Sequence, residues 1–554
     1  MQIPLEDKSK IKIQTYEISP NSKYKALKRF LYEKIDLKSP IHKFTYITNF
    51  KYINNKSYLM ARRYFTKADA FTIFHFLGIL MQGIGIVLLL PVIVALIYGE
   101  FEYILPLIAP SLCSIALGIA LHKNFKKYTN LKLKHGMFIS SFAWLWATLI
   151  GAVIMVACLH IHFVDALFEN MSAWTGSGMT FFVNVEILPY SILFLRSLEQ
   201  WVGGLGVVII FIGILIRSGT AAARLYKSEA REEKIKPSIA NTLKKTLEIY
   251  LIYTGFGIAL YILAGLPIFD AVNLAFTSIS TGGMSIKNLN VGFYQNNIIY
   301  VITMFLMILG AVSFNVHYKV IKTKGKSIFK DIQFRVMASF IIFFSIVIFL
   351  TNSGIVPMDI LFHVVSAVTT TGSNISTAQT ISTWHGSTLI ILMALMVIGS
   401  SAGSTGGGLK IVRFITVLKG INHTISSIVS PEGRVIPTKI AGKKLTEREV
   451  REAGAYISIY FIFLVFGWVI LCFYGLDPLN ALFDVVSILS NTGLSTGIVW
   501  GGLPLIPKVT LIFLMWLGRL EIIPVLVVFR TFIELASPRK VKKNLINRTQ
   551  KQDF

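Results

Sequence analysis

The stretch Asp165-Ala-Leu-Phe-Glu-Asn-Met-Ser-Ala-Trp-Thr-Gly-Ser-Gly178 decides the fold, because the chain repeats its pattern four times. Each copy begins with Asp or Asn, reaches a glycine 13 positions later, and has a hydroxyl residue six positions before that glycine. A register kept four times indicates an internal structural repeat. The other copies run from Asp270 to Gly283, Asp359 to Gly372 and Asn480 to Gly493, and the hydroxyl residues are Ser172, Thr277, Ser366 and Ser487.

Each copy lies between two longer apolar stretches and is itself too short to cross a bilayer. About twelve residues make a helix of roughly 18 Å, about half of the bilayer thickness. Asp and Asn are good helix N-caps and favour the positive end of the helix dipole. We therefore expect four re-entrant helices that enter from outside and stop near mid-membrane. Their predicted caps are Asp165, Asp270, Asp359 and Asn480.

The loops that follow these short helices are the candidate ion-binding segments. Helix C-termini carry partial negative charge, so four of them converging on one axis favour a cation. Glycine permits backbone angles in which carbonyl groups point inward, as in potassium filters. The predicted filter residues are Gly176, Ser177 and Gly178; Thr281, Gly282 and Gly283; Thr370, Thr371 and Gly372; and Asn491, Thr492 and Gly493.

The composition excludes an ordinary soluble enzyme. Of the 554 residues, 54% are hydrophobic and 15% charged, whereas a soluble protein averages about 25% charged residues. The net charge of +26 does not indicate a nucleic-acid partner, because the basic residues lie between long apolar runs as the positive-inside rule requires. The three cysteines have no CxxC spacing, which favours neither a disulfide framework nor a zinc site.

Ten apolar stretches are candidate membrane spans, and basic loops follow every second one, so these loops and both termini are expected to be cytoplasmic. The first seventy residues are polar and basic and do not resemble a cleavable signal peptide. The expected spans are 71–98, 104–121, 137–159, 187–216, 246–265, 297–316, 335–351, 388–409, 453–474 and 506–533.

The predicted fold is an all-α polytopic membrane protein. Four parallel span, pore-helix, span repeats surround one pseudo-fourfold pore, as in potassium channels, and two extra transmembrane helices precede them. The expected divisions are a basic cytoplasmic extension (1–70), two extra helices (71–122), repeat one (137–216), repeat two (246–316), repeat three (335–417), repeat four (452–536) and a cytoplasmic tail (537–554).

The second span of the third repeat is interrupted by small residues. Such residues are poor choices for a continuous helix, so the helix is expected to break there, and a broken backbone at this depth implies a cavity. Small residues also serve helix packing in membranes, which is the competing interpretation. The stretch is not a nucleotide-binding P-loop, because Leu409 separates its last glycine from Lys410. The residues concerned are Gly403, Ser404, Thr405, Gly406, Gly407 and Gly408.

Arg519 lies near the middle of the last span, where a charge costs at least about 2.5 to 3.5 kcal/mol. It must therefore face the pore or a polar partner. The alternative to a pore position is a local ion pair with Glu521 or Glu199. Arg196 and Glu199 stand at i, i+3 spacing and are interpreted as a structural ion pair.

These motifs resemble the Trk/Ktr/HKT superfamily of cation transporters, and within it the TrkH/TrkG type. Besides the four filter loops, the resemblance rests on segments 200–206 (Gln-Trp-Val-Gly-Gly-Leu-Gly), 399–410 and 518–521. The extra pair of spans before the repeats also matches the TrkH type. Two departures are Gly176, where the family commonly has threonine, and the basic N-terminal extension, which has no counterpart in it.

The resemblance implies potassium uptake across the inner membrane of a bacterium. It implies that the interrupted segment 403–408 closes the pore beneath the filter, and that Arg519 lies at this constriction. It also implies a homodimer in the lipid membrane, and a cytoplasmic TrkA-like subunit that carries the nucleotide. The basic loops 217–245 and 410–451 are the candidate docking surfaces. The chain itself is expected to bind no cofactor, and K⁺ is the transported ion.

Three other functions are alternatives to potassium uptake of the TrkH type. A membrane-embedded enzyme lacks support because the sequence has no HExxH, GxSxG or phosphorylation motif and no intramembrane carboxylate pair. A Ktr-like Na⁺-dependent or mixed Na⁺/K⁺ translocator stays open, since each repeat offers one glycine. An alternating-access carrier would be expected to show inverted repeats and one or two broken helices, not four parallel repeats.

Overall fold

The computed structural model describes residues 65–206, 239–323, 327–352, 354–431, 434, 437–440 and 442–536. All described elements belong to one compact unit, which begins at Lys67. The basic extension predicted at 1–70 lies almost wholly outside the described residues. Loop residues 217–238 and the tail 537–554 lie outside them as well.

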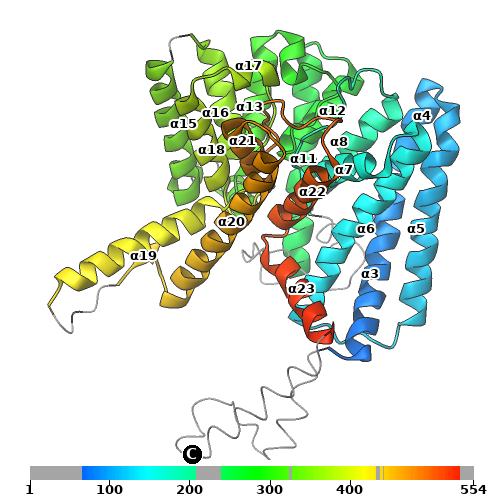
Figure 1. Cartoon of the computed structure of the whole chain (residues 1–554), viewed down its shortest axis with the longest axis horizontal. Coiled ribbons are helices and arrows are strands. Elements are labelled where there is room, and N and C mark those ends of the chain that lie inside the picture. Colours follow the sequence, from blue (N-terminus) through cyan, green and yellow to red (C-terminus); the bar gives the residue numbers. More distant parts are fainter. Residues whose placement is uncertain are drawn as a thin grey trace, which may run out of the picture. The chain divides into compact units, whose positions relative to one another are not determined.

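Nearly all of the described secondary structure is helical (Figure 1). The helices before the repeats are α3 (Lys67–Leu88), α4 (Leu90–Tyr98), η1 (Phe101–Tyr103) and α5 (Ile104–Asn124). The next two groups are α6 (Leu133–Leu159), α7 (Phe163–Thr175) and α8 (Tyr190–Leu205), then α11 (Ile239–Leu263), α12 (Ile268–Ile279), η2 (Asn290–Tyr294), α13 (Asn297–Ala311), α14 (Phe314–Lys322) and η3 (Ile328–Lys330). The last two are α15 (Ile332–Thr351), α16 (Pro357–Thr369), α17 (Ala378–Ser382), α18 (Gly386–Ile398) and α19 (Ile411–Val429), then α20 (Glu447–Phe473), α21 (Pro478–Leu489), α22 (Leu505–Arg519) and α23 (Ile523–Ala536). A two-stranded antiparallel sheet, β1 (Lys439–Ile440) with β2 (Lys443–Lys444), precedes α20 and pairs Lys439 with Lys444.

The order long helix, short helix, further helix recurs four times: α6–α7–α8, α11–α12–α13, α15–α16–α18 and α20–α21–α22. In each group the short helix packs against the long helix before it and the helix after it. This is the element order that the sequence repeat predicts, although the boundaries expected for the repeats stay a prediction.

Six helices in the described part of the chain are long and apolar enough to cross a membrane, or up to eight if each of two bent pairs is one span. Six of the ten predicted spans overlap these helices (71–98, 104–121, 137–159, 246–265, 335–351 and 453–474), and two overlap the bent pairs (297–316 and 506–533). Predicted span 187–216 contains the 16-residue helix α8 and then leaves the described residues at 207. Predicted span 388–409 contains the 13-residue helix α18, which ends at Ile398 because a glycine-rich segment follows.

The two bent pairs break where the backbone leaves the α region. Helices α13 and α14 meet at 101°, and Ser313 caps the second one by accepting a hydrogen bond from the Asn315 amide at 3.3 Å. Helices α22 and α23 meet at 114°, and the residues between them, Glu521 and Ile522, have φ of 54° and 64°. A β-branched residue with positive φ is rare and costs conformational energy, so the surrounding structure must hold this turn.

The extra helices α3 and α5 pack closely through glycine. A Cβ added to Gly78 would lie 2.6 Å from the carbonyl oxygen of Gly118, and one added to Gly118 would lie equally close to the Gly78 oxygen. Small residues allow such backbone approach between membrane helices. The pair also packs against α6, and so joins the first group of helices.

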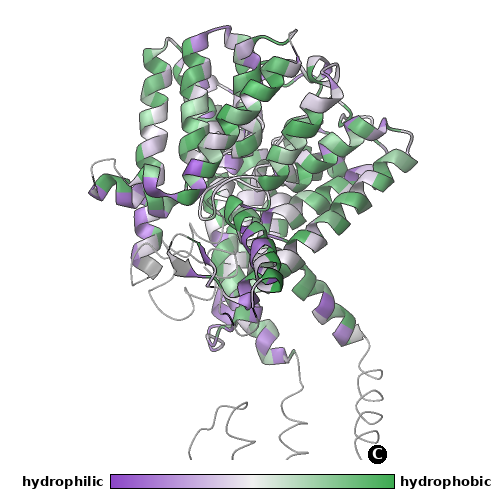
Figure 2. Cartoon of the chain, turned by 90° about the vertical axis from the view of Figure 1, so that its left-hand side faces the viewer, coloured by the Kyte–Doolittle hydropathy of each residue, from purple (hydrophilic) through white to green (hydrophobic). Residues whose placement is uncertain are grey.

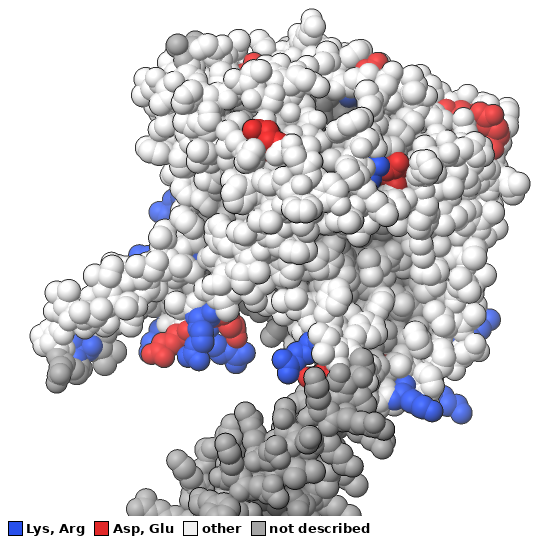
Figure 3. All heavy atoms as spheres, in the orientation of Figure 1, with Lys and Arg blue, Asp and Glu red and all other residues white. Residues whose placement is uncertain are grey.

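The surface has the character of a membrane protein. Most residues of the helices are hydrophobic (Figure 2), and large apolar side chains are exposed, including Ile97, Leu350 and Phe473 at 73%, 75% and 87%. Most visible Lys and Arg lie at the lower end of the view in Figure 3, whereas most visible Asp and Glu lie at the upper end. The chain therefore presents an apolar belt between two ends of different charge.

Candidate functional site

The four short helices have the predicted length but begin three residues earlier than predicted. Their N-cap residues are His162, Pro267, Val356 and Asp477. Extended backbone at these positions starts each helix, and in α16 and α21 a proline occupies the first helical position, where its missing N–H costs nothing. The prediction that Asp165, Asp270, Asp359 and Asn480 are caps is therefore wrong, since all four lie at the third helical position.

Two of these first-turn carboxylates bind neighbouring side chains. Asp165 forms an ion pair with Lys508, which also donates a 2.7 Å hydrogen bond to the carbonyl of Gly501. Asp270 accepts a 2.9 Å hydrogen bond from the hydroxyl of Tyr294. The carboxylates of Asp165, Asp270 and Asp359 still lie in the first helical turn, at the positive end of the helix dipole. The favourable interaction between charge and dipole therefore does not require that these residues be caps.

The four loops after the short helices share one backbone conformation. In each, the residue before the final glycine donates its N–H to the carbonyl of the repeated hydroxyl residue, at 2.8 to 3.0 Å. The final glycines have φ between 71° and 106°. The residues two positions earlier also have positive φ: Gly176 (74°), Thr281 (52°), Thr370 (53°) and Asn491 (51°).

This conformation explains the departure at Gly176. Glycine adopts left-handed backbone angles without steric cost, whereas threonine is uncommon there. The first loop thus uses the residue best suited to a conformation that Thr281 and Thr370 adopt under strain. Gly176 therefore preserves the loop geometry.

The final glycines bring the four loops into contact with one another in cyclic order. A Cβ added to Gly178 would lie 2.3 Å from the carbonyl oxygen of Gly282, in the second loop. The same relation joins the second loop to the third, the third to the fourth and the fourth to the first. The corresponding distances are 2.1 Å from Gly283 to the oxygen of Thr371, 2.0 Å from Gly372 to that of Thr492, and 2.4 Å from Gly493 to that of Ser177.

The helix of the third group breaks between α18 and α19, where the small residues predict a break. The segment from Gly399 to Lys410 is not helical, and both of these residues have positive φ. Thr405 donates hydrogen bonds from its hydroxyl to the carbonyls of Gly310 at 2.9 Å and Ile279 at 3.2 Å. The segment therefore contacts the C-terminal end of the second short helix.

The same segment contacts the third and fourth loops. The Gly407 amide donates to the Thr370 hydroxyl at 2.6 Å, and the Gly408 amide donates to the Ser490 carbonyl at 3.0 Å. A Cβ added to Gly407 would lie 1.9 Å from that same Ser490 oxygen. Segment 399–410 thus packs directly against three of the four loop regions. A small pocket adjoins it, lined by Gly406, Gly407, Gly408, Lys410, Asn491, Gly518, Arg519 and Glu521.

Arg519 joins this segment to the first group of helices. Its guanidinium donates to the carbonyls of Gly203 at 2.5 Å and Gly204 at 2.9 Å, at the end of α8, and to that of Thr405 at 3.2 Å. It also lies over the ring of Trp144, 5.1 Å from the centroid. These carbonyls compensate a charge that would be costly in the membrane. Glu521, the pairing partner considered from sequence, forms an ion pair with Arg413.

Arg196 pairs with Glu169 of α7, so the interpretation of Arg196 and Glu199 as an ion pair is wrong. The Arg196 Nε lies 2.7 Å from the Glu169 carboxylate, and both side chains are almost fully buried. Glu169 also accepts from the Thr180 hydroxyl at 3.0 Å and the Phe181 amide at 3.2 Å. Helical spacing places Glu199 on the same side as Arg196, but the acid on the neighbouring helix is the one in contact.

Sequence reasoning missed a set of buried polar residues behind the loops. Asp484 of α21 accepts from the Ser495 hydroxyl at 2.9 Å and from the Thr496 amide at 2.8 Å. It stands nine positions before its loop glycine, as Glu169 does before Gly178. Both carboxylates therefore fasten the chain just after the glycine to the short helix before it. The repeat alignment could have indicated these residues, because the same position is polar in the third copy as well, where it is His363. Only the second copy has an apolar residue there, Leu274.

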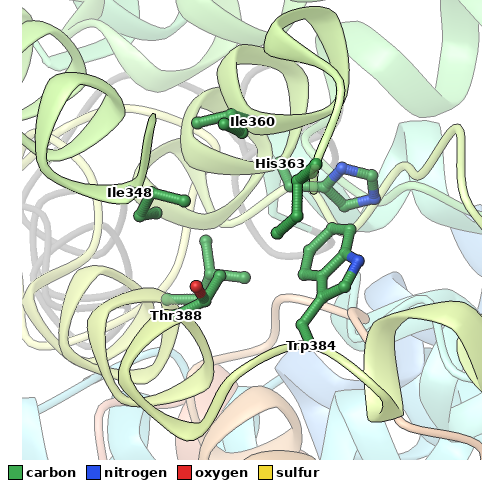
Figure 4. A pocket seen from close by; sticks show the side chains of 7 residues that line it. Ile348, Ile360, His363, Trp384 and Thr388 are labelled. Carbon is green, nitrogen blue, oxygen red and sulfur yellow. The ribbon is translucent and has the colours of Figure 1, made fainter. Parts of the chain in front are cut away.

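A second, narrow hollow lies between α15, α16 and α18 (Figure 4). Its lining is mostly apolar, and none of the predicted filter or gate residues belongs to it. Buried His363 binds the carbonyl of Asp359 through Nδ1 at 2.8 Å and meets the ring of Trp384 edge-on. The lining residues are Ile348, Ile355, Ile360, His363, Trp384, Thr388 and Leu392.

Known proteins share this architecture. The family model described as "Cation transport protein", TrkH, matches residues 108–358 and 345–542. An uncharacterized cation transporter of Methanocaldococcus jannaschii is 42% identical over 84% of this chain and 96% of its own length. The potassium uptake protein TrkH of Salmonella typhimurium is 29% identical over 82% and 96%. The crystal structure of the potassium transporter TrkH from Vibrio parahaemolyticus superposes with a TM-score of 0.72 at 27% identity, covering 83% of this chain and 98% of that one.

The apolar helices and these relatives define a multi-pass membrane transporter of cations and not an enzyme. The chain belongs to the TrkH family of cation transport proteins.

Proposed function

We propose that this chain takes up K⁺ across the cytoplasmic membrane, through a selectivity filter formed by its four loops. The observation that carries the proposal is the cyclic contact of Gly178, Gly283, Gly372 and Gly493, each with the carbonyl before the glycine of the next loop. Because the relation closes after four steps, it supports a pseudo-fourfold arrangement of the repeats. Curated relatives and a solved structure that are named for potassium uptake support the choice of ion.

The filter residues and the short helices together favour a cation. Each short helix ends directly at its loop, so four negative dipole ends converge on the ring. Backbone carbonyls are suitable ligands for K⁺, because they replace its hydration shell without supplying full negative charge. The proposed ligands are carbonyl oxygens of residues 176–178, 281–283, 370–372 and 491–493.

Segment 403–408 and Arg519 are proposed as the gate beneath this filter. The segment contacts the loop regions of the second, third and fourth repeats, and Arg519 connects it to the first. A positive charge next to the ring raises the barrier to a passing cation, while its hydrogen bonds to carbonyls hold the segment in place. Gating therefore requires that these hydrogen bonds open.

We further propose that both termini and the basic loops are cytoplasmic, as the positive-inside rule requires. The end of the described unit at which Lys and Arg gather (Figure 3) is then the cytoplasmic end. The relative from Methanocaldococcus jannaschii, an archaeon, leaves the bacterial origin a proposal. A homodimer and a TrkA-like nucleotide-binding subunit remain proposals taken from the family resemblance. Within loop 410–451, the candidate docking surface, the structure describes helix α19, the sheet of β1 and β2, and the start of α20 (Figure 1).

Uptake of ⁸⁶Rb⁺ in a potassium-uptake-deficient bacterium tests the function. Wild-type protein, produced with its regulatory subunit, is expected to restore growth at low K⁺ and to take up Rb⁺. Gly372→Ala is expected to abolish uptake, because its Cβ would lie 2.0 Å from a backbone oxygen at a φ of 79°. Gly354→Ala is the matched control, since a Cβ there meets nothing within 4 Å. Well-expressed wild-type protein without uptake would refute the proposal.

Related transport measurements distinguish the alternative ions and mechanisms. A Ktr-like translocator would require Na⁺ for K⁺ uptake, and a mixed translocator would carry ²²Na⁺ at a comparable rate. An alternating-access carrier would saturate at a low turnover in proteoliposomes, where a pore passes ions far faster. We expect K⁺ uptake that does not depend on Na⁺, because the four loops contribute backbone carbonyls at equivalent positions.

A further inference from the structure

We infer that Gln200 is a positioning residue that makes the filter asymmetric and determines how well it discriminates K⁺ from Na⁺; this inference rests on the proposed function. Gln200 lies in α8 of the first repeat and is fully buried. Its side-chain amide binds the loop of the second repeat on both sides of Gly283. Nε2 donates to the Gly282 carbonyl at 2.7 Å, and Oε1 accepts from the Met284 amide at 3.0 Å.

The repeat itself shows that this glutamine is an exception. In each of the four groups a glycine lies at the end of the helix after the loop: Gly203, Gly310 and Gly518 lie in the last turn of α8, α13 and α22, and Gly399 directly follows α18. Three positions before that glycine, the first group has Gln200 and the other three have Met307, Met396 and Met515. All three methionines are fully buried. Glutamine and methionine have similar lengths, so the difference is chemical and not one of size.

Only one of the four equivalent carbonyls receives this hydrogen bond. The oxygens of Gly282, Ser177, Thr371 and Thr492 occupy the same place in the cyclic contact. Among the described residues, those of Ser177, Thr371 and Thr492 accept no hydrogen bond, whereas that of Gly282 accepts the one from Gln200. A donor at a carbonyl oxygen competes with a bound cation for its lone pairs. The second repeat therefore presents a weaker field than its three counterparts.

The bond also limits movement of the second loop. Gly282 fits so closely against Gln200 that a Cβ would lie 2.5 Å from the glutamine Cδ. One helical turn earlier, Arg196 donates to the Ser285 carbonyl at 2.9 Å. The first repeat thus holds the backbone of the second from Gly282 to Ser285. A loop held in this way resists the inward contraction that the smaller Na⁺ requires.

Both effects predict the same change when the hydrogen bonds are removed. In Gln200→Met, the Gly282 carbonyl has a stronger field and the loop is freer to contract, and both favour the smaller ion. One hydrogen bond is worth about a fivefold change in an equilibrium. We therefore expect the K⁺ over Na⁺ discrimination to fall about fivefold while K⁺ uptake persists.

The test measures inhibition of ⁸⁶Rb⁺ uptake by Na⁺ and by K⁺ in the uptake-deficient strain, for wild type, Gln200→Met and Met307→Leu. Met307→Leu alters the equivalent position of the second repeat without touching a hydrogen bond, so its inhibition ratio should match that of wild type. The ratio is independent of how much protein is made. Gln200→Glu serves as a second variant, because it retains the acceptor for Met284 but places a carboxylate oxygen against the Gly282 carbonyl, and it should lower discrimination at least as far.

Two outcomes overturn the inference, and they differ from failure of the proposed function. If Gln200→Met is produced at a lower level but keeps the wild-type ratio, Gln200 is only structural. If Met307→Leu shifts the ratio equally, the effect belongs to packing and not to the hydrogen bonds. Absence of Rb⁺ uptake by wild type would instead refute the filter proposal itself.

Discussion

At the scale of single residues, the positively charged guanidinium of Arg519 donates hydrogen bonds to backbone carbonyls of the first and third repeats. Arg519→Gln removes the charge while retaining a hydrogen-bond donor. We expect cation flux to rise about tenfold, which corresponds to a decrease of about 1.4 kcal/mol in the barrier when the repelling charge is removed. Flux measured in proteoliposomes tests this, with Arg530→Gln on the exposed side of α23 as the control. A fall in flux with loss of protein would indicate a structural role for Arg519.

Glu169 and Asp484 occupy equivalent positions but have different partners, which predicts unequal effects on stability. Glu169→Gln leaves Arg196 buried beside a neutral side chain, and breaking such a pair costs about 3 to 5 kcal/mol. Asp484→Asn weakens hydrogen bonds from Ser495 and Thr496, which are worth about 1 to 2 kcal/mol. Thermal unfolding in detergent should show the larger decrease for Glu169→Gln. Equal decreases would contradict the assigned ion pair.

At the scale of elements, segment 399–410 replaces helix with a loop that packs against the end of α12 and the loops after α16 and α21. Gly407→Ala would place a Cβ 1.9 Å from the Ser490 oxygen, so the segment must move away from the fourth loop. We expect flux to change about fivefold, upward if the segment blocks the pore. Gly386→Ala at the start of the same α18 helix is the control, because only Leu479 approaches it, at 3.8 Å. Unchanged flux and regulation in Gly407→Ala would end the gate assignment.

Element lengths and their order could be predicted from the sequence, but contacts between elements could not. The repeat spacing predicts the four short helices because periodic apolar residues and glycines act locally. The caps were misplaced although Pro357 and Pro478 are typical of a first helical position. The partner of Arg196 lies on another helix, 27 residues away, and helical periodicity contains no information about such a pair. Arg519 required a polar partner, but its carbonyl ligands depend on the bends of three chain segments.

At the scale of the whole molecule, the cyclic contact predicts that the final glycines of the four loops are equally indispensable if the loops form the proposed filter. Gly178→Ala, Gly283→Ala and Gly493→Ala should each abolish selective Rb⁺ uptake as Gly372→Ala does, because every added Cβ would lie within 2.4 Å of a backbone oxygen of the adjacent loop. Uptake by each variant in the deficient strain, normalised to protein in the membrane, tests this. A variant that retains wild-type uptake and selectivity would remove its loop from the filter.

A further consequence follows from building such a ring out of one polypeptide. When four identical subunits form a ring, one mutation alters all four positions at once and symmetry is preserved. Here each quarter of the ring is encoded separately, so the first repeat can have glutamine at position 200 while the other three repeats have methionine at the equivalent position. On the inference that Gln200 sets ion preference, a single substitution changes that preference through one quarter of the ring, whereas the same substitution in a ring of four identical subunits acts at all four positions.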